Sequence, residues 1–80
     1  METSDVENLV LKVMVRSLEL SPSECRQAKW RETREWDSFA FVEMIAEFED
    51  AFDHEFDDVE IESMQDFSSM VAVLTEISSQ

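Results

Sequence analysis

The chain contains no glycine, and its only proline is Pro22. Glycine readily adopts the positive backbone φ angles that tight hairpin turns demand, so few positions in this chain suit such turns. A sheet of hairpin-connected strands is therefore disfavoured. With 80 residues, the sequence is long enough for a single domain over 1–80 with one small core, and we expect that domain to be all-α.

Basic residues are scarce and lie at one end of the sequence. They are Lys12, Arg16, Arg26, Lys29, Arg31 and Arg34. From Ser38 to Gln80 there are twelve carboxylates and no Lys or Arg, and the net charge of the chain is −14. Proteins that bind nucleic acid or anionic membranes need cations to meet phosphates, so we expect neither partner. Basic protein surfaces are the natural complement of so acidic a chain.

Cys25 is the only cysteine, so no disulfide can form within the chain. This suits a reducing compartment, and because the acidic start of the sequence does not resemble a signal peptide, we expect a cytoplasmic protein. The longest apolar stretch, residues 9–15, contains Lys12 and is too short to cross a bilayer. One His and one Cys without evident partners form no catalytic constellation, so we do not expect an enzyme.

Apolar residues recur at helical spacing in three segments, which we expect to form the main helices. These segments are residues 5–18, 38–52 and 67–78. Ser4 or Asp5 is placed to cap the first helix, and Asp66 to cap the last. A minor helix is expected around 58–63. The predicted architecture is a small bundle of three to four helices with a long loop between the first and second.

The long connection, residues 19–37, contains two tryptophans. A structureless connection of this length would be unusual inside a compact domain, so we expect a short helical turn near 23–31. Trp30 is predicted to anchor the connection to the core, and Trp36 to be a packing residue that fixes it.

The segment 38–52 divides most clearly into two faces. Its predicted core face consists of Phe41, Met44, Ile45, Phe48 and Phe52. The opposite face carries Glu43 and Glu47 one turn apart, a spacing at which like charges slightly destabilise a helix, so these acids point to a use outside folding. Phe39, Val42 and Ala46 form an apolar strip beside them. We interpret these five residues as a docking face for a basic partner.

The tripeptide Asp37-Ser38-Phe39 stands where the long connection becomes this helix. With the apolar and acidic pattern that follows it, the sequence resembles the acyl carrier protein family, the phosphopantetheine-attachment domains. The family pattern is Asp-Ser-Leu before a helix with apolar residues at fixed offsets, and the resemblance covers nearly the whole chain. Trp36 stands where many fatty-acid carriers have glycine. Phenylalanine in place of leucine, as in Phe39, also occurs in D-alanyl carriers.

By this resemblance, a phosphopantetheinyl transferase would attach 4'-phosphopantetheine from coenzyme A to Ser38, with Asp37 part of the attachment motif. The arm would hold acyl groups as thioesters and move them between enzymes of a fatty-acid, polyketide or other specialised pathway. An aminoacyl cargo such as D-alanine is the alternative. A serine at a helix N-terminus would place the phosphodiester beside unpaired backbone N–H groups and the positive end of the helix dipole. We expect a monomer whose partners are the transferase and the basic surfaces of loading and processing enzymes.

Simpler interpretations exist for each of these features. Ser38 could serve only as a helix N-cap, and Phe39 could pack under the long connection. The chain could be an acidic adaptor that binds a basic partner without a prosthetic group. His54 stands among aspartates, yet the residues from Asp53 lack the glycine of a calcium-binding loop, so we expect no metal site.

Overall fold

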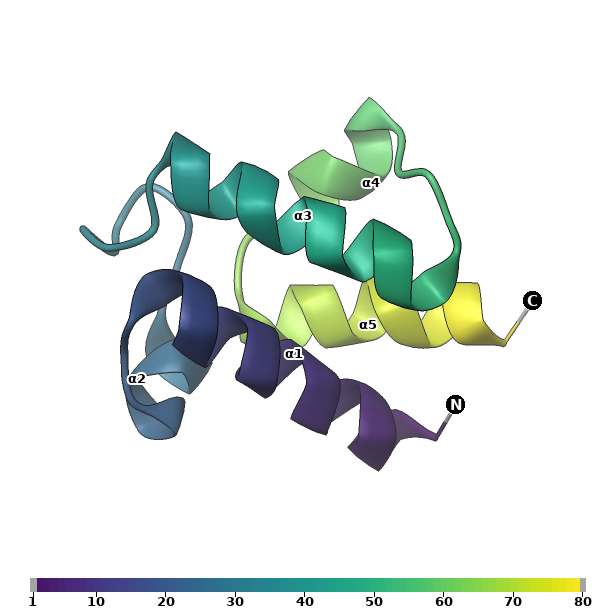
Figure 1. Ribbon diagram of the computed structural model, residues 1–80, viewed down its shortest axis with the longest axis horizontal. Coiled ribbons are helices and arrows are strands. Elements are labelled where there is room, and N and C mark those ends of the chain that lie inside the picture. Colours follow the sequence, from purple (N-terminus) through teal and green to yellow (C-terminus); the bar gives the residue numbers. More distant parts are fainter. Residues whose placement is uncertain (1, 80) are drawn as a thin grey trace.

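The computed structural model describes residues 2–79, which fold into a small all-α bundle (Figure 1). Its helices are α1 (Thr3–Leu18), α2 (Pro22–Gln27), α3 (Ser38–Phe52), α4 (Asp58–Ser63) and α5 (Phe67–Ser78). The predicted all-α class is confirmed. The long connection between the first two main helices, α1 and α3, is also present, and it carries the short helix α2.

Side-chain caps fix where four of the helices begin. In each case the capping side chain accepts a hydrogen bond from the backbone N–H three residues on, and the caps are Ser21, Asp37, Asp57 and Asp66. The first helix differs, because its N-cap is Glu2 and no side chain caps it. The predicted cap at Ser4 or Asp5 is therefore wrong. Both residues lie in an exposed first turn that precedes Val6, the first buried residue of α1.

The core lies between α1 and the two long helices packed against it, α3 and α5, and α2 packs against α1 and α5. Its most deeply buried large side chains include Val6, Val10, Met14, Met44, Phe48, Met70 and Leu74. On α3 the predicted core face is confirmed for Phe41, Met44, Ile45 and Phe48, while Phe52 is only partly buried. The helix α3 thus divides along its length between a packed face and an open face, as its spacing predicts.

Aromatic packing holds the second part of the long connection against α3. Trp36 is 2% exposed, and its ring meets Phe41 edge-on with centroids 5.6 Å apart. Trp30 meets the same phenylalanine edge-on at 4.9 Å. The backbone N–H of Trp30 donates to the carbonyl of Gln65 at 2.8 Å, which ties the connection to the α4–α5 link. The predictions for both tryptophans are confirmed.

Unbalanced negative charge is expected to limit the stability of this bundle. Within residues 2–79, the only ion pair between Lys or Arg and a carboxylate joins Arg16 to Glu47, so most carboxylates of a chain with net charge −14 lack a cationic partner. Salt screens such repulsion, with a Debye length of about 8 Å at physiological ionic strength. We expect the melting temperature to rise with sodium chloride, and with magnesium chloride at lower concentration. A melting temperature that stays flat in both titrations would contradict this.

Candidate functional site

Ser38 is the first residue of α3, and Asp37 before it is the N-cap. The Asp37 carboxylate accepts a hydrogen bond from the backbone N–H of Ala40 at 2.8 Å. Because Asp37 occupies the capping position, the interpretation of Ser38 as the N-cap is wrong. Ser38 itself is exposed, and its hydroxyl has no hydrogen-bond partner within residues 2–79. The hydroxyl is therefore open to chemical modification from solvent.

The start of α3 also has the electrostatics that suit an anionic substituent on Ser38. The first backbone N–H groups of a helix have no partner within the helix, and here the Asp37 side chain engages only that of Ala40. The aligned peptide dipoles of this 15-residue helix place partial positive charge at the same end. A phosphodiester on Ser38 Oγ would therefore lie beside free N–H donors.

An apolar hollow of about 450 Å³ opens beside Ser38 and extends along α3 towards α4. Besides Ser38 it is lined by Trp30, Phe41, Val42, Ile45, Ala46, Glu49 and Ile61. One wall is α3, and the others come from the long connection and from α4. Sequence spacing did not predict this hollow, because its walls come from three separate parts of the chain. Its apolar lining is close enough to Ser38 to contact a group attached to that residue.

The apolar residues of the predicted docking face are on the surface. Phe39 is 74% exposed and Val42 is 67% exposed, and Ala46 is also exposed. The alternative in which Phe39 packs under the long connection is therefore wrong. Val42 and Ala46 also line the hollow, so the strip follows its rim. A protein that covered this strip would close over the region next to Ser38.

The two glutamates of the predicted docking face differ in their surroundings. Glu47 is half-buried and forms an ion pair with Arg16 of α1. Glu43 is exposed and has no ion pair within residues 2–79. Lys12 and Arg16 line a hollow of about 440 Å³ between α1 and α3, together with Glu47 and Asp50. Basic residues of α1 therefore neutralise part of the acidic face. The residue pattern along α3 alone could not predict this neutralisation.

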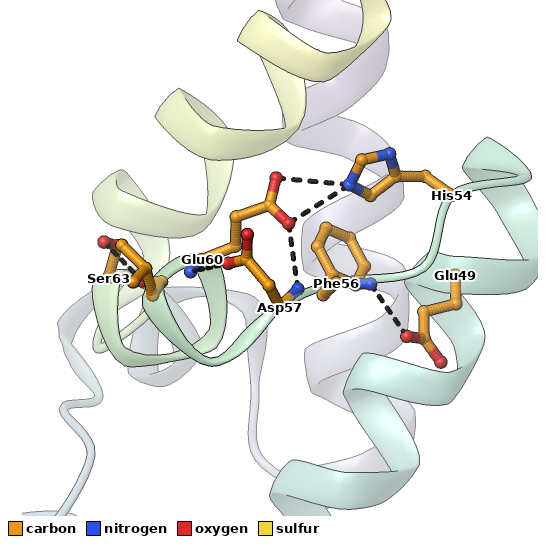
Figure 2. A network of polar contacts seen from close by, with 7 residues as sticks. Glu49, His54, Phe56, Asp57, Glu60 and Ser63 are labelled. Atoms are coloured by element: carbon orange, nitrogen blue, oxygen red, sulfur yellow. Dashed lines mark hydrogen bonds and ion pairs between the residues drawn. The ribbon is translucent and has the colours of Figure 1, made fainter.

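A polar network fixes α4 to the end of α3 (Figure 2). The Glu49 carboxylate accepts the backbone N–H of Phe56 at 3.0 Å. His54 Nε2 lies 3.2 Å and 3.1 Å from the two carboxylate oxygens of Glu60, a residue that also completes the capping box of α4. These contacts hold Ile61, and with it the far wall of the apolar hollow, in a defined place.

The other side chains with reactive or metal-binding chemistry are Cys25 and the acidic residues near His54. Cys25 is buried in α2, and burial raises the pKa of its thiol, so the thiol stays protonated at neutral pH. Within residues 2–79, no group of three or more His, Cys, Asp or Glu side chains is arranged to hold a metal ion. In the same range no helix is both long enough and apolar enough to cross a membrane.

No protein-family model matches this chain, and a search of curated proteins also finds no match. The assignment of a function therefore depends on the residues of the chain and on the geometry around Ser38.

Proposed function

We propose that this chain is an acyl carrier protein, in which Ser38 bears a 4'-phosphopantetheine arm derived from coenzyme A. The observation that carries the proposal is the position of Ser38, exposed on the first turn of α3 directly after the Asp37 cap, with an apolar hollow opening beside it. Acyl groups would travel on this arm as thioesters between the enzymes of a fatty-acid, polyketide or related pathway.

The attachment step is a phosphoryl-type transfer in which the protein supplies the nucleophile. Ser38 Oγ attacks the pantetheine-linked phosphorus of coenzyme A, a phosphodiester forms, and the adenosine bisphosphate leaves. The serine proton passes to a base on the transferase. The free N–H groups and dipole of α3 favour the resulting anion. The apolar hollow can then cover part of the cargo. Each methylene removed from water stabilises the covered form by about 0.8 kcal/mol.

Partner recognition would depend on the exposed face of α3. Phe39 and Val42 offer apolar contact, and Glu43 offers charge for a basic surface. Electrostatic complementarity of this kind mainly raises the association rate. The expected partners are the phosphopantetheinyl transferase and the basic surfaces of enzymes that load and process the cargo. Intact mass after incubation with coenzyme A and a promiscuous transferase tests the proposal, since one arm should be added.

Phe39→Ala is expected to weaken partner binding without weakening the fold. Phe39 is 74% exposed, so the free energy of unfolding should change by no more than about 0.5 kcal/mol. An interface anchor of this size should contribute more than about 1 kcal/mol to binding of the transferase. Chemical denaturation and the modification rate at low transferase concentration measure the two effects. A normal modification rate with normal stability would remove Phe39 from the docking face.

Glu43→Gln is expected to slow modification more than Glu47→Gln does. Glu43 is free to meet a basic partner, whereas Glu47 is already paired with Arg16. At low salt we expect Glu43→Gln to lower the association rate about threefold, and the effect should shrink as salt is added. Arg16→Gln is the control. In a protein that carries it, Glu43→Gln and Glu47→Gln should slow modification equally. If the two substitutions slow modification equally in the wild-type background, Arg16 does not mask Glu47. If neither substitution slows modification, the acidic face has no part in recognition and leaves the proposal.

A further inference from the structure

A second hollow, of about 470 Å³, adjoins the one that opens at Ser38. The two share Trp30, Phe41 and Ile61 as lining residues, so both lie against the same aromatic and aliphatic side chains. The remaining lining of the second hollow is polar and consists of Arg31, Glu62 and Gln65. The two hollows, which we together call the groove, therefore have an apolar part beside Ser38 and a polar part beside Arg31.

Arg31 is the cation of this polar part. It is exposed, and it forms no ion pair within residues 2–79, although Glu62 lines the same hollow. Its guanidinium carbon lies 6.0 Å from the centroid of the Trp30 ring. Its backbone φ is 76°, in the left-handed region that is unfavourable for a residue with a Cβ atom. A strained backbone of this kind persists only where the surrounding structure holds it.

The surrounding contacts show what holds Arg31. On one side, the backbone N–H of Trp30 donates to the carbonyl of Gln65 at 2.8 Å. On the other, the backbone N–H of Lys29 donates to Thr33 Oγ1 at 2.8 Å, and the N–H of Thr33 donates back to the Lys29 carbonyl at 2.9 Å. Arg31 therefore lies in a hydrogen-bonded turn that is held against the α4–α5 link, and not in an unconstrained loop.

We propose that this groove selects a cargo that ends in a carboxylate, and that Arg31 binds that carboxylate. The inference rests on the proposed function, because the arm on Ser38 brings the cargo to the groove. A chain of net charge −14 repels an anionic acyl group, so such a group needs a local cation. The planar donors of a guanidinium match a carboxylate, and Trp30, Phe41 and Ile61 match an apolar stem. The cargo class is the monothioester of a dicarboxylic acid.

Three cargoes that each have four carbons but differ in end charge test this inference. Butyryl, succinyl and 4-aminobutyryl groups are attached through a stable amide to coenzyme A analogues, and the transferase loads each onto the full chain. We expect the succinyl form to melt about 4 °C above the butyryl form, and the 4-aminobutyryl form to show no such gain. Arg31→Gln should abolish the difference. Arg34→Gln is the matched control, because Arg34 is an exposed base of the same connection that lines neither hollow.

The failures of the two proposals are distinguishable. Equal melting temperatures for the succinyl and butyryl forms would overturn the cargo inference and leave attachment at Ser38 intact. If Arg31→Gln shifts the melting temperature of protein with a bare arm as much as that of the succinyl form, Arg31 acts on the fold or on the phosphodiester, and the cargo inference is wrong. If no analogue is attached at all, the proposed function fails, and the cargo inference fails with it.

Discussion

Trp36→Ala is expected to lower the free energy of unfolding by about 3–5 kcal/mol, the range for truncation of a buried large aromatic residue. Trp36 is 2% exposed, packs edge-on against Phe41, and lies 6.3 Å from the ring of Trp30. Its loss would leave a cavity where the long connection meets α3. Small domains have stabilities near the low end of about 5–15 kcal/mol, so a loss of this size leaves the variant with little stability, and we expect part of it to be unfolded at low salt.

Chemical denaturation in high salt, where we expect the wild type to have its largest free energy of unfolding, measures this change. Phe39→Ala is the matched control, because it truncates an exposed aromatic residue three positions further on. Trp36→Phe should cost less than Trp36→Ala, since phenylalanine keeps an aromatic ring in the site and leaves a smaller cavity. Both substitutions also remove the buried indole N–H of Trp36, which has no partner within residues 2–79. A loss below about 1 kcal/mol for Trp36→Ala would contradict the packing role of this residue.

The bounds of the later helices could be predicted because an acidic cap stands directly before the apolar pattern. The predicted segments 38–52 and 67–78 match α3 and α5, which begin after Asp37 and Asp66. The start of α1 could not be predicted in this way. Glu2 provides no side-chain cap, so the helix extends through a polar first turn that carries no apolar signal.

The candidate site could be predicted only as far as it is local in sequence. The placement of Asp37 and Ser38 at the start of a helix, and the exposure of Phe39, follow from the periodicity of one segment. The apolar hollow, the pairing of Glu47 with Arg16, and the position of Arg31 depend on how separate helices and the long connection pack together. No spacing within α3 encodes those contacts.

Ser38→Ala is expected to abolish attachment of the arm and leave the fold intact. The alanine side chain has no hydroxyl to act as nucleophile. Ser38 is exposed and does not cap α3, because the Asp37 carboxylate performs that role, so the free energy of unfolding should change by no more than about 0.5 kcal/mol. Ser68→Ala is the matched control, since Ser68 is an exposed serine in the first turn of α5, after the Asp66 cap.

The measurement that tests the central claim most directly is the intact mass of the three proteins after incubation with coenzyme A and a promiscuous phosphopantetheinyl transferase. The wild type and Ser68→Ala should each gain the mass of one phosphopantetheine arm, and Ser38→Ala should gain none. Modification of Ser38→Ala would contradict the assignment of the site. A wild type that gains no mass would contradict the carrier function itself, and would favour an acidic adaptor that acts without a prosthetic group.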